Sequence, residues 1–207
     1  DQPTVVPNFD GSRPVDKVAA SLMSKLKGGV QPANRNKVKM FGNRAPIWKL
    51  LSNIPHKQLL WQAVNDPLIN RDLVPNKFIA EVFPALALPA LIPYFFDRGK
   101  CAKYNPANKK QFNIEDWVRI CTFMEQFGIK YHIAGLYDWA VEAKHILEPT
   151  KSDQDKLDGA ICSVIGFKWF IDGTKTNLII GDIQKGYVLT PVIPEISDVL
   201  TKSAKQR

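Results

Sequence analysis

Hydrophobic residues recur at helical spacing near the beginning of the chain. In "VDKVAASLMSKLKGG" the apolar positions repeat every three or four residues, at Val15, Val18, Leu22 and Leu26. This spacing places them on one face of a helix. The two glycines that follow are a typical stop signal. The pattern therefore predicts a helix that ends at Gly28 and Gly29.

The same periodicity predicts helices at "IWKLLSN", "HKQLLWQAV", "NIEDWVRICTFMEQFG" and "GLYDWAVEAKHIL". In the third of these, Asn113 suits the N-cap and Gly128 suits the end. "ALALPALIPYFF" predicts a helix interrupted at Pro89 and Pro93, because proline lacks the backbone N–H that an interior helical position donates.

Strand signals are few. "KFIAEVFP" is rich in β-branched and aromatic residues and lies between Asn76 and Pro84, which predicts a strand. "NLIIGDIQKGYVLTPV" predicts two strands joined by a turn at "QKG". The result is a helix-rich α/β protein with a thin sheet. We expect the natural protein to extend further at its N-terminus and to supply strands there.

Composition and charge narrow the class of protein. The 207 residues are 45% hydrophobic and 23% charged, with a formal net charge of +8. This suits a single domain over residues 1–207 without a membrane span, and we expect a cytoplasmic location. The three cysteines and three histidines show no ligand spacing. The basic balance favours a polyanionic partner, with nucleic acid the foremost example.

Acidic residues gather at the start of the helix predicted in "SDQDKLDGAICSVIGFKW". Ser152 and Asp155 resemble a capping box, and acidic residues in a first turn suit the helix dipole. Capping explains Ser152, Asp153 and Asp155, but it explains Asp158 less well. Asp155 and Asp158 are three residues apart, so they share a helix face. A metal-binding role for this pair is the alternative.

Glu81 is a carboxylate inside an otherwise apolar predicted strand. Such a group is costly unless it is solvated, paired or bound to a metal. The plainer interpretation is a half-exposed strand with Glu81 in water. Asp1 would also count as a solvated terminal residue if it were considered alone. Together with the helix carboxylates, however, these residues are the oxygen donors that Mg²⁺ or Mn²⁺ prefers.

Five segments together resemble an uncharacterised family of predicted nucleases with an RNase H-like fold. They are "DQP", "RPVD", "AEVFP", "QDKLDGAIC" and "GDIQKGYVLTP", at Asp1–Pro3, Arg13–Asp16, Ala80–Pro84, Gln154–Cys162 and Gly181–Pro191. In that family the corresponding motifs are an "IDxP" strand end, an "R-x-x-D" helix start, an "iEvhP" strand, a "DDxxDA" helix and a closing "GYIvvP" hairpin. Each motif is weak alone, and the match rests on their common order.

The resemblance implies a mixed sheet flanked by helices, with a helical insertion at about 30–76. It also implies a metal centre near Asp1, Glu81 and either Asp155 or Asp158, at which bound Mg²⁺ or Mn²⁺ would support phosphodiester hydrolysis. Two features depart from the family. Its first aspartate-bearing strand has no counterpart here, and Gln154 stands where the family has the first aspartate of its "DD" pair. The alternative function is therefore an inactive RNase H-like module that binds nucleic acid or a protein.

Two loops, residues 30–46 and 99–111, are basic and contain no acidic residue. They supply most of the predicted nucleic-acid contacts, because Lys and Arg bind phosphate oxygens. A solvated basic surface is the equally weighted alternative. The predicted contact residues are Arg13, Arg35, Lys37, Lys39, Arg44, Lys103, Lys109 and Lys110.

Overall fold

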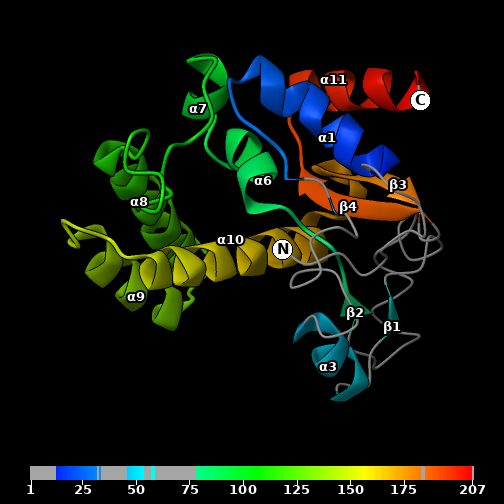
Figure 1. The fold of residues 1–207 in the computed structure, drawn as a ribbon. Coiled ribbons are helices and arrows are strands. Elements are labelled where there is room, and N and C mark those ends of the chain that lie inside the picture. Colours follow the sequence, from blue (N-terminus) through cyan, green and yellow to red (C-terminus); the bar gives the residue numbers. More distant parts are fainter. Residues whose placement is uncertain are drawn as a thin grey trace.

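The computed structural model describes residues 13–31, 33, 46–53, 57–58, 78–182 and 185–206. This part of the chain is a mixed α/β structure built from helices and small two-stranded sheets (Figure 1). None of its helices combines the length and the apolar character that crossing a membrane would require.

The antiparallel hairpin predicted near the C-terminus is confirmed. Strand β3 spans Asn177–Asp182 and pairs with β4, Gly186–Pro191, so that Ile179 lies opposite Leu189. Helices α1, Pro14–Lys25, and α11, Pro194–Lys205, pack on one face of the hairpin, and α10, Lys151–Asp172, packs on the other (Figure 1). The sheet is thus the middle of three layers.

Side chains of β4 alternate between two hydrophobic clusters. Val188 packs with α1 and α11, whereas its neighbour Leu189 packs with α10 and the helices beyond it. Successive residues of a strand point to opposite faces, so a strand covered on both faces is buried throughout. Every residue of β4 is buried accordingly.

Helix α10 spans Lys151–Asp172 and begins with a true capping box. Thr150 is the N-cap: its hydroxyl accepts a hydrogen bond from the backbone N–H of Asp153, and the Asp153 carboxylate accepts one from the backbone N–H of Thr150. The predicted box of Ser152 and Asp155 is therefore wrong by two residues. The acidic first turn is a cap, as that interpretation expected.

Helices α8, Ile114–Lys130, and α9, Ala134–Lys144, form an antiparallel pair beside α10. Asn113 caps α8 as predicted and accepts hydrogen bonds from two backbone N–H groups. Gly128 does not end the helix. It lies where a Cβ atom would come within 2.8 Å of the Tyr137 backbone nitrogen, so the glycine permits the two helices to approach closely.

Proline positions explain the next pair of helices only in part. Helix α6, Pro84–Leu91, continues through Pro89, so the predicted interruption there is wrong. The chain does break at Ile92 and Pro93 before α7, Tyr94–Asp97, begins. The predicted strand is shorter than expected: β2 covers Phe78–Ile79, and Val82 forms one isolated parallel bridge with Leu189.

Within the predicted insertion at 30–76, the structure describes helix α3, Pro46–Asn53, as predicted. It also describes strand β1, Lys57–Gln58, which pairs in parallel with β2. These two residues had been predicted to be helical, and pairing with β2 overrides their local helical pattern. The remainder of "HKQLLWQAV" lies outside the described residues.

Candidate functional site

Glu81 lies inside the protein and forms an ion pair. Its side chain is buried, and both of its carboxylate oxygens accept hydrogen bonds from the Arg13 guanidinium, at 2.9 Å for Nη1 and 2.5 Å for Nη2. The same guanidinium donates to the carboxylate of Asp16. The plainer expectation of a water-exposed Glu81 is therefore wrong. The cost of burying its charge is offset by a buried arginine.

The three charged residues are joined by these hydrogen bonds and are here called the arginine cluster: Arg13, Asp16 and Glu81. Asp16 also accepts hydrogen bonds from the backbone N–H groups of Arg13 and Ala33. Burial by itself would lower the pKa of Arg13, but the hydrogen bonds and charges of Glu81 and Asp16 raise it overall. Arg13 was predicted to contact nucleic acid; in the structure its guanidinium is engaged inside the protein.

The hairpin is shaped to accommodate this arginine. Gly186 has a φ of 99°, and a Cβ atom there would lie 2.9 Å from Arg13 Cδ and Nη1. Any other residue would strain the backbone and collide with the side chain. In addition, the backbone N–H of Leu189 donates to the carbonyl of Glu81 at 2.8 Å.

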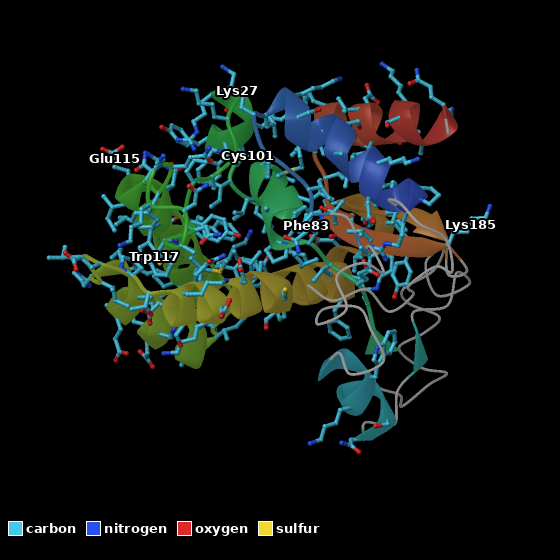
Figure 2. All side chains as sticks on the ribbon, in the orientation of Figure 1. Lys27, Phe83, Cys101, Glu115, Trp117 and Lys185 are labelled. Atoms are coloured by element: carbon cyan, nitrogen blue, oxygen red, sulfur yellow. The ribbon has the colours of Figure 1, made fainter. Side chains whose placement is uncertain are left out.

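A polar pocket of about 330 Å³ lies beside the end of α1, the helix that carries Asp16, and the start of α6. Its lining comes from the end of α1, the segment before α6, the loop 99–111 and the first half of α10. Figure 2 labels Phe83 and Cys101, two of the lining residues, in the middle of the molecule. The polar residues of the lining are Gln31, Lys103, Tyr104, Asn105, Asn108, Gln111, Gln154 and Asp158.

Asp158 lies in the wall of this pocket. Its Oδ1 atom accepts a hydrogen bond of 2.7 Å from the Tyr104 hydroxyl, and its Oδ2 atom accepts one of 3.0 Å from Gln154 Nε2. Burial raises the pKa of Asp158, and these two hydrogen bonds only partly oppose the rise. Among the residues that the structure describes, Asp158 makes no salt bridge.

Asp155 differs from Asp158 although both were predicted on one helix face. Its side chain is exposed and forms an i,i+4 ion pair with Lys151 at 2.6 Å. Gln154, which replaces an expected aspartate, is buried and bridges Lys151 to Asp158. The structure thus brings Gln154 and Asp158 into the pocket and leaves Asp155 on the surface.

The basic loop 99–111 borders the pocket. Lys103 lines it, and its Nζ donates to the carbonyl of Lys27 and to Gln111 Oε1. Lys109 and Lys110 are exposed and stand between two lining residues, Asn108 and Gln111. One of the predicted phosphate-binding lysines therefore lines the pocket, and two more lie on the same loop next to lining residues.

The other predicted contacts, Arg35, Lys37, Lys39 and Arg44, lie outside the described residues, as does Asp1. In the described part of the chain, no group of three or more His, Cys, Asp or Glu side chains could hold a metal ion. Glu81 has both oxygens bound to Arg13, and Asp158 supplies a single carboxylate. The described residues do not by themselves fit a Mg²⁺ or Mn²⁺ centre, and the predicted ligand set stays a prediction.

Sequence reasoning did not assign a role to Tyr104 in holding Asp158. The two residues are 54 positions apart, so no local pattern connects them. The basic loop that contains Tyr104 was the one available signal. Comparisons with protein-family models, with curated proteins and with solved structures each found no match to this chain.

Proposed function

We propose that this protein is an RNase H-like domain that binds nucleic acid, with the loop 99–111 as its contact surface. The observation that carries the proposal is the position of this acid-free, lysine-rich loop at the edge of a polar pocket. Lysines on an exposed loop attract phosphates, and pocket amides and aromatic rings contact bases.

Contacts between the segments of the family resemblance support the fold assignment. Arg13 and Asp16 meet Glu81, Glu81 is hydrogen-bonded to β4 through Leu189, and α10 packs on the same hairpin. Four of the five segments thus lie on elements that these contacts link, although the segments are far apart in sequence. Such convergence is expected if they form one structural unit, and it supports an RNase H-like assignment.

The binding proposal is tested by fluorescence anisotropy with labelled single-stranded DNA, RNA and duplexes over a range of salt. The double variant Lys109→Ala/Lys110→Ala is expected to weaken binding about tenfold. It should also reduce the salt slope for single strands by up to about 1.4, which corresponds to two lost phosphate contacts.

The double variant Lys202→Ala/Lys205→Ala is the matched control. It removes the same charge from exposed positions on α11, which packs against α1 and β3. Equal losses in the two variants would mean a general charge effect and would contradict a contact surface at the loop. Absence of salt-dependent binding by the full chain would overturn the proposal.

Metal-dependent cleavage is the second candidate function, and one observation favours it. Asp158 is a pocket carboxylate that makes no salt bridge within the described residues, whereas Glu81 has an arginine. A complete metal centre would need further ligands from outside the described part, with Asp1 as the foremost candidate.

The test is incubation of the protein with DNA, RNA and hybrid substrates in the presence of Mn²⁺ or Mg²⁺. Cleavage that is lost in Asp158→Asn and kept in Asp198→Asn, an exposed aspartate of α11, would support this candidate. Intact substrates under all of these conditions would leave the binding module as the function.

A further inference from the structure

We infer that the pocket beside loop 99–111 is a subsite for one nucleobase that carries an exocyclic amino group, as adenine, guanine and cytosine do. This inference rests on the proposed function and specifies it: one nucleotide enters the pocket base first, and its phosphate stays at the lysine edge. The argument uses the size of the pocket, its acceptor, its charge pattern and its rings.

The size of the cavity suits a small ligand. At about 330 Å³ it lies at the lower end of the range for small-molecule sites, which run from about 300 to 1,000 Å³. The backbone at Gly28 and Gly29 forms part of its wall. A base unstacked from a single strand can therefore enter without opening a helix of the protein.

Asp158 supplies the acceptor that an amino group needs. A carboxylate offers about four lone-pair positions. The hydrogen bonds from Tyr104 and Gln154 use two of them, and they are the two that Asp158 accepts within the described residues. Burial leaves the Asp158 charge poorly solvated and raises its pKa, so an N–H donor from a ligand would be a favourable addition.

Charge around the pocket favours a ligand with an anionic group. Lys103 lines the cavity, and Lys109 and Lys110 are exposed on the loop between the lining residues Asn108 and Gln111. A nucleotide suits both the carboxylate and the lysines, because the amino group of its base can face Asp158 while its phosphate faces the lysines.

The remaining lining completes the match to a base. Phe83 and Phe112 are half-buried residues of the lining, and aromatic side chains at a cavity wall are surfaces on which a planar base can stack. Side-chain amides of Asn108 and Gln111 can donate to or accept from the base edge. Bases held in protein pockets are recognised by this combination of stacking and edge hydrogen bonds.

The test uses mononucleotides, so that it is independent of binding to long nucleic acids. Guanosine monophosphate and adenosine monophosphate are each compared with inosine monophosphate, which lacks both the 2-amino group of guanine and the 6-amino group of adenine. Cytidine monophosphate is compared with uridine monophosphate, which carries an oxygen in place of the amino group. Binding to the full chain is followed by NMR titration. The amino-bearing member of at least one pair is expected to bind about tenfold more tightly.

Two variants locate the effect. Asp158→Asn is expected to remove most of the preference for the amino group. Gly29→Leu is expected to weaken the binding of every nucleotide at least tenfold by filling the cavity. The fold can accept this change, because a Cβ atom at Gly29 meets nothing within 4 Å. Gly135→Leu on α9 is the matched control, since a Cβ there also meets nothing within 4 Å and Gly135 is not part of the lining.

The outcomes separate the two proposals. Equal affinities within every nucleotide pair, or binding in Gly29→Leu as tight as in Gly135→Leu, would overturn the base subsite. If loop-dependent binding of oligonucleotides persisted in that case, the proposed nucleic-acid binding would stand without the subsite. Loss of oligonucleotide binding together with intact mononucleotide discrimination would overturn the proposed function instead.

Discussion

Glu81 and Asp158 are two carboxylates enclosed by the same protein in opposite ways. Glu81 is buried, and both of its carboxylate oxygens accept hydrogen bonds from a buried arginine. Asp158 is half-buried and faces a cavity, and within the described residues it accepts hydrogen bonds from two neutral groups. A buried charge with a bound counter-charge is part of the structure, whereas one held by neutral donors beside a cavity is poised for an external partner.

This contrast changes the interpretation of the acidic residues. From the sequence, Glu81 and Asp158 formed one candidate metal centre. In the structure Glu81 belongs to the arginine cluster, which joins the start of α1 to the hairpin. Asp158 belongs to the pocket, and four predictions test whether the two carboxylates differ as described.

The largest effect is expected at Glu81. Replacement by glutamine removes one partner of a buried ion pair and leaves the Arg13 charge only partly compensated, which should lower the free energy of unfolding by about 3–5 kcal/mol. Urea denaturation followed by circular dichroism measures this loss. Lys17→Ala, at an exposed position of α1, is the control and should change stability by less than about 0.5 kcal/mol. A loss below that level in Glu81→Gln would mean that the pair is not structural.

Gly186→Ala should lower the free energy of unfolding by about 1–3 kcal/mol, because φ is 99° and the new methyl group would collide with Arg13. The same denaturation experiment measures it. If the arginine cluster depends on this glycine, the double variant Gly186→Ala/Arg13→Met should lose less than the sum of the single losses. If the loss in the double variant equalled the sum of the two single losses, the collision with Arg13 would not contribute to the destabilisation by Gly186→Ala.

Tyr104→Phe removes one of the two donors to Asp158 and should cost about 1.5 kcal/mol, the size expected of a hydrogen bond to a charged group. The variant should also raise the pKa of Asp158 further, because the hydrogen bond from Tyr104 is the largest of the influences that lower this pKa. NMR titration of the Asp158 carboxyl group gives this value directly. An unchanged pKa would show that the hydroxyl does not donate to the carboxylate.

The smallest effect is expected for Asp158→Asn, and its sign is opposite to that of Glu81→Gln. Because the folded pKa of Asp158 lies above the ordinary value of 3.8, ionisation in the folded state is disfavoured. The stability that the protonated form provides is present below pH 3.8 and is lost as pH rises through the folded pKa. As pH rises from 3.8 through the folded pKa of Asp158, the free energy of unfolding of Asp158→Asn should therefore increase relative to that of the parent protein. A relative loss over the same pH range would place Asp158 with Glu81 as a structural group.

Local features of the fold were predictable because they depend on neighbouring residues. Asn113 preceding two acidic residues identified the start of α8, and the turn at "QKG" identified the hairpin. Helix α11 was not predicted, although Pro194, Glu195 and the basic residues of its last turn are ordinary helix signals. The cap of α10 was misplaced by two residues, because several side chains near its start are competent caps.

The pairing of the candidate site residues was not predictable from the sequence. Arg13 and Glu81 are 68 residues apart, and Glu81 alone is equally consistent with water, an arginine or a metal. The periodicity did indicate that Asp158 lies near the core, and the anomaly of a carboxylate at that position was informative. Its partner Tyr104 could be found only from the way the loop folds over α10.

The environment of the cysteines gives these experiments an internal reporter. Burial raises the pKa of Cys101 and Cys162, and it raises that of Cys121 to about 12. Thiolates are the species that react with alkylating reagents, so the folded protein should be labelled slowly at neutral pH and the unfolded chain quickly. The rate of alkylation can therefore report how often each variant opens, with no added probe.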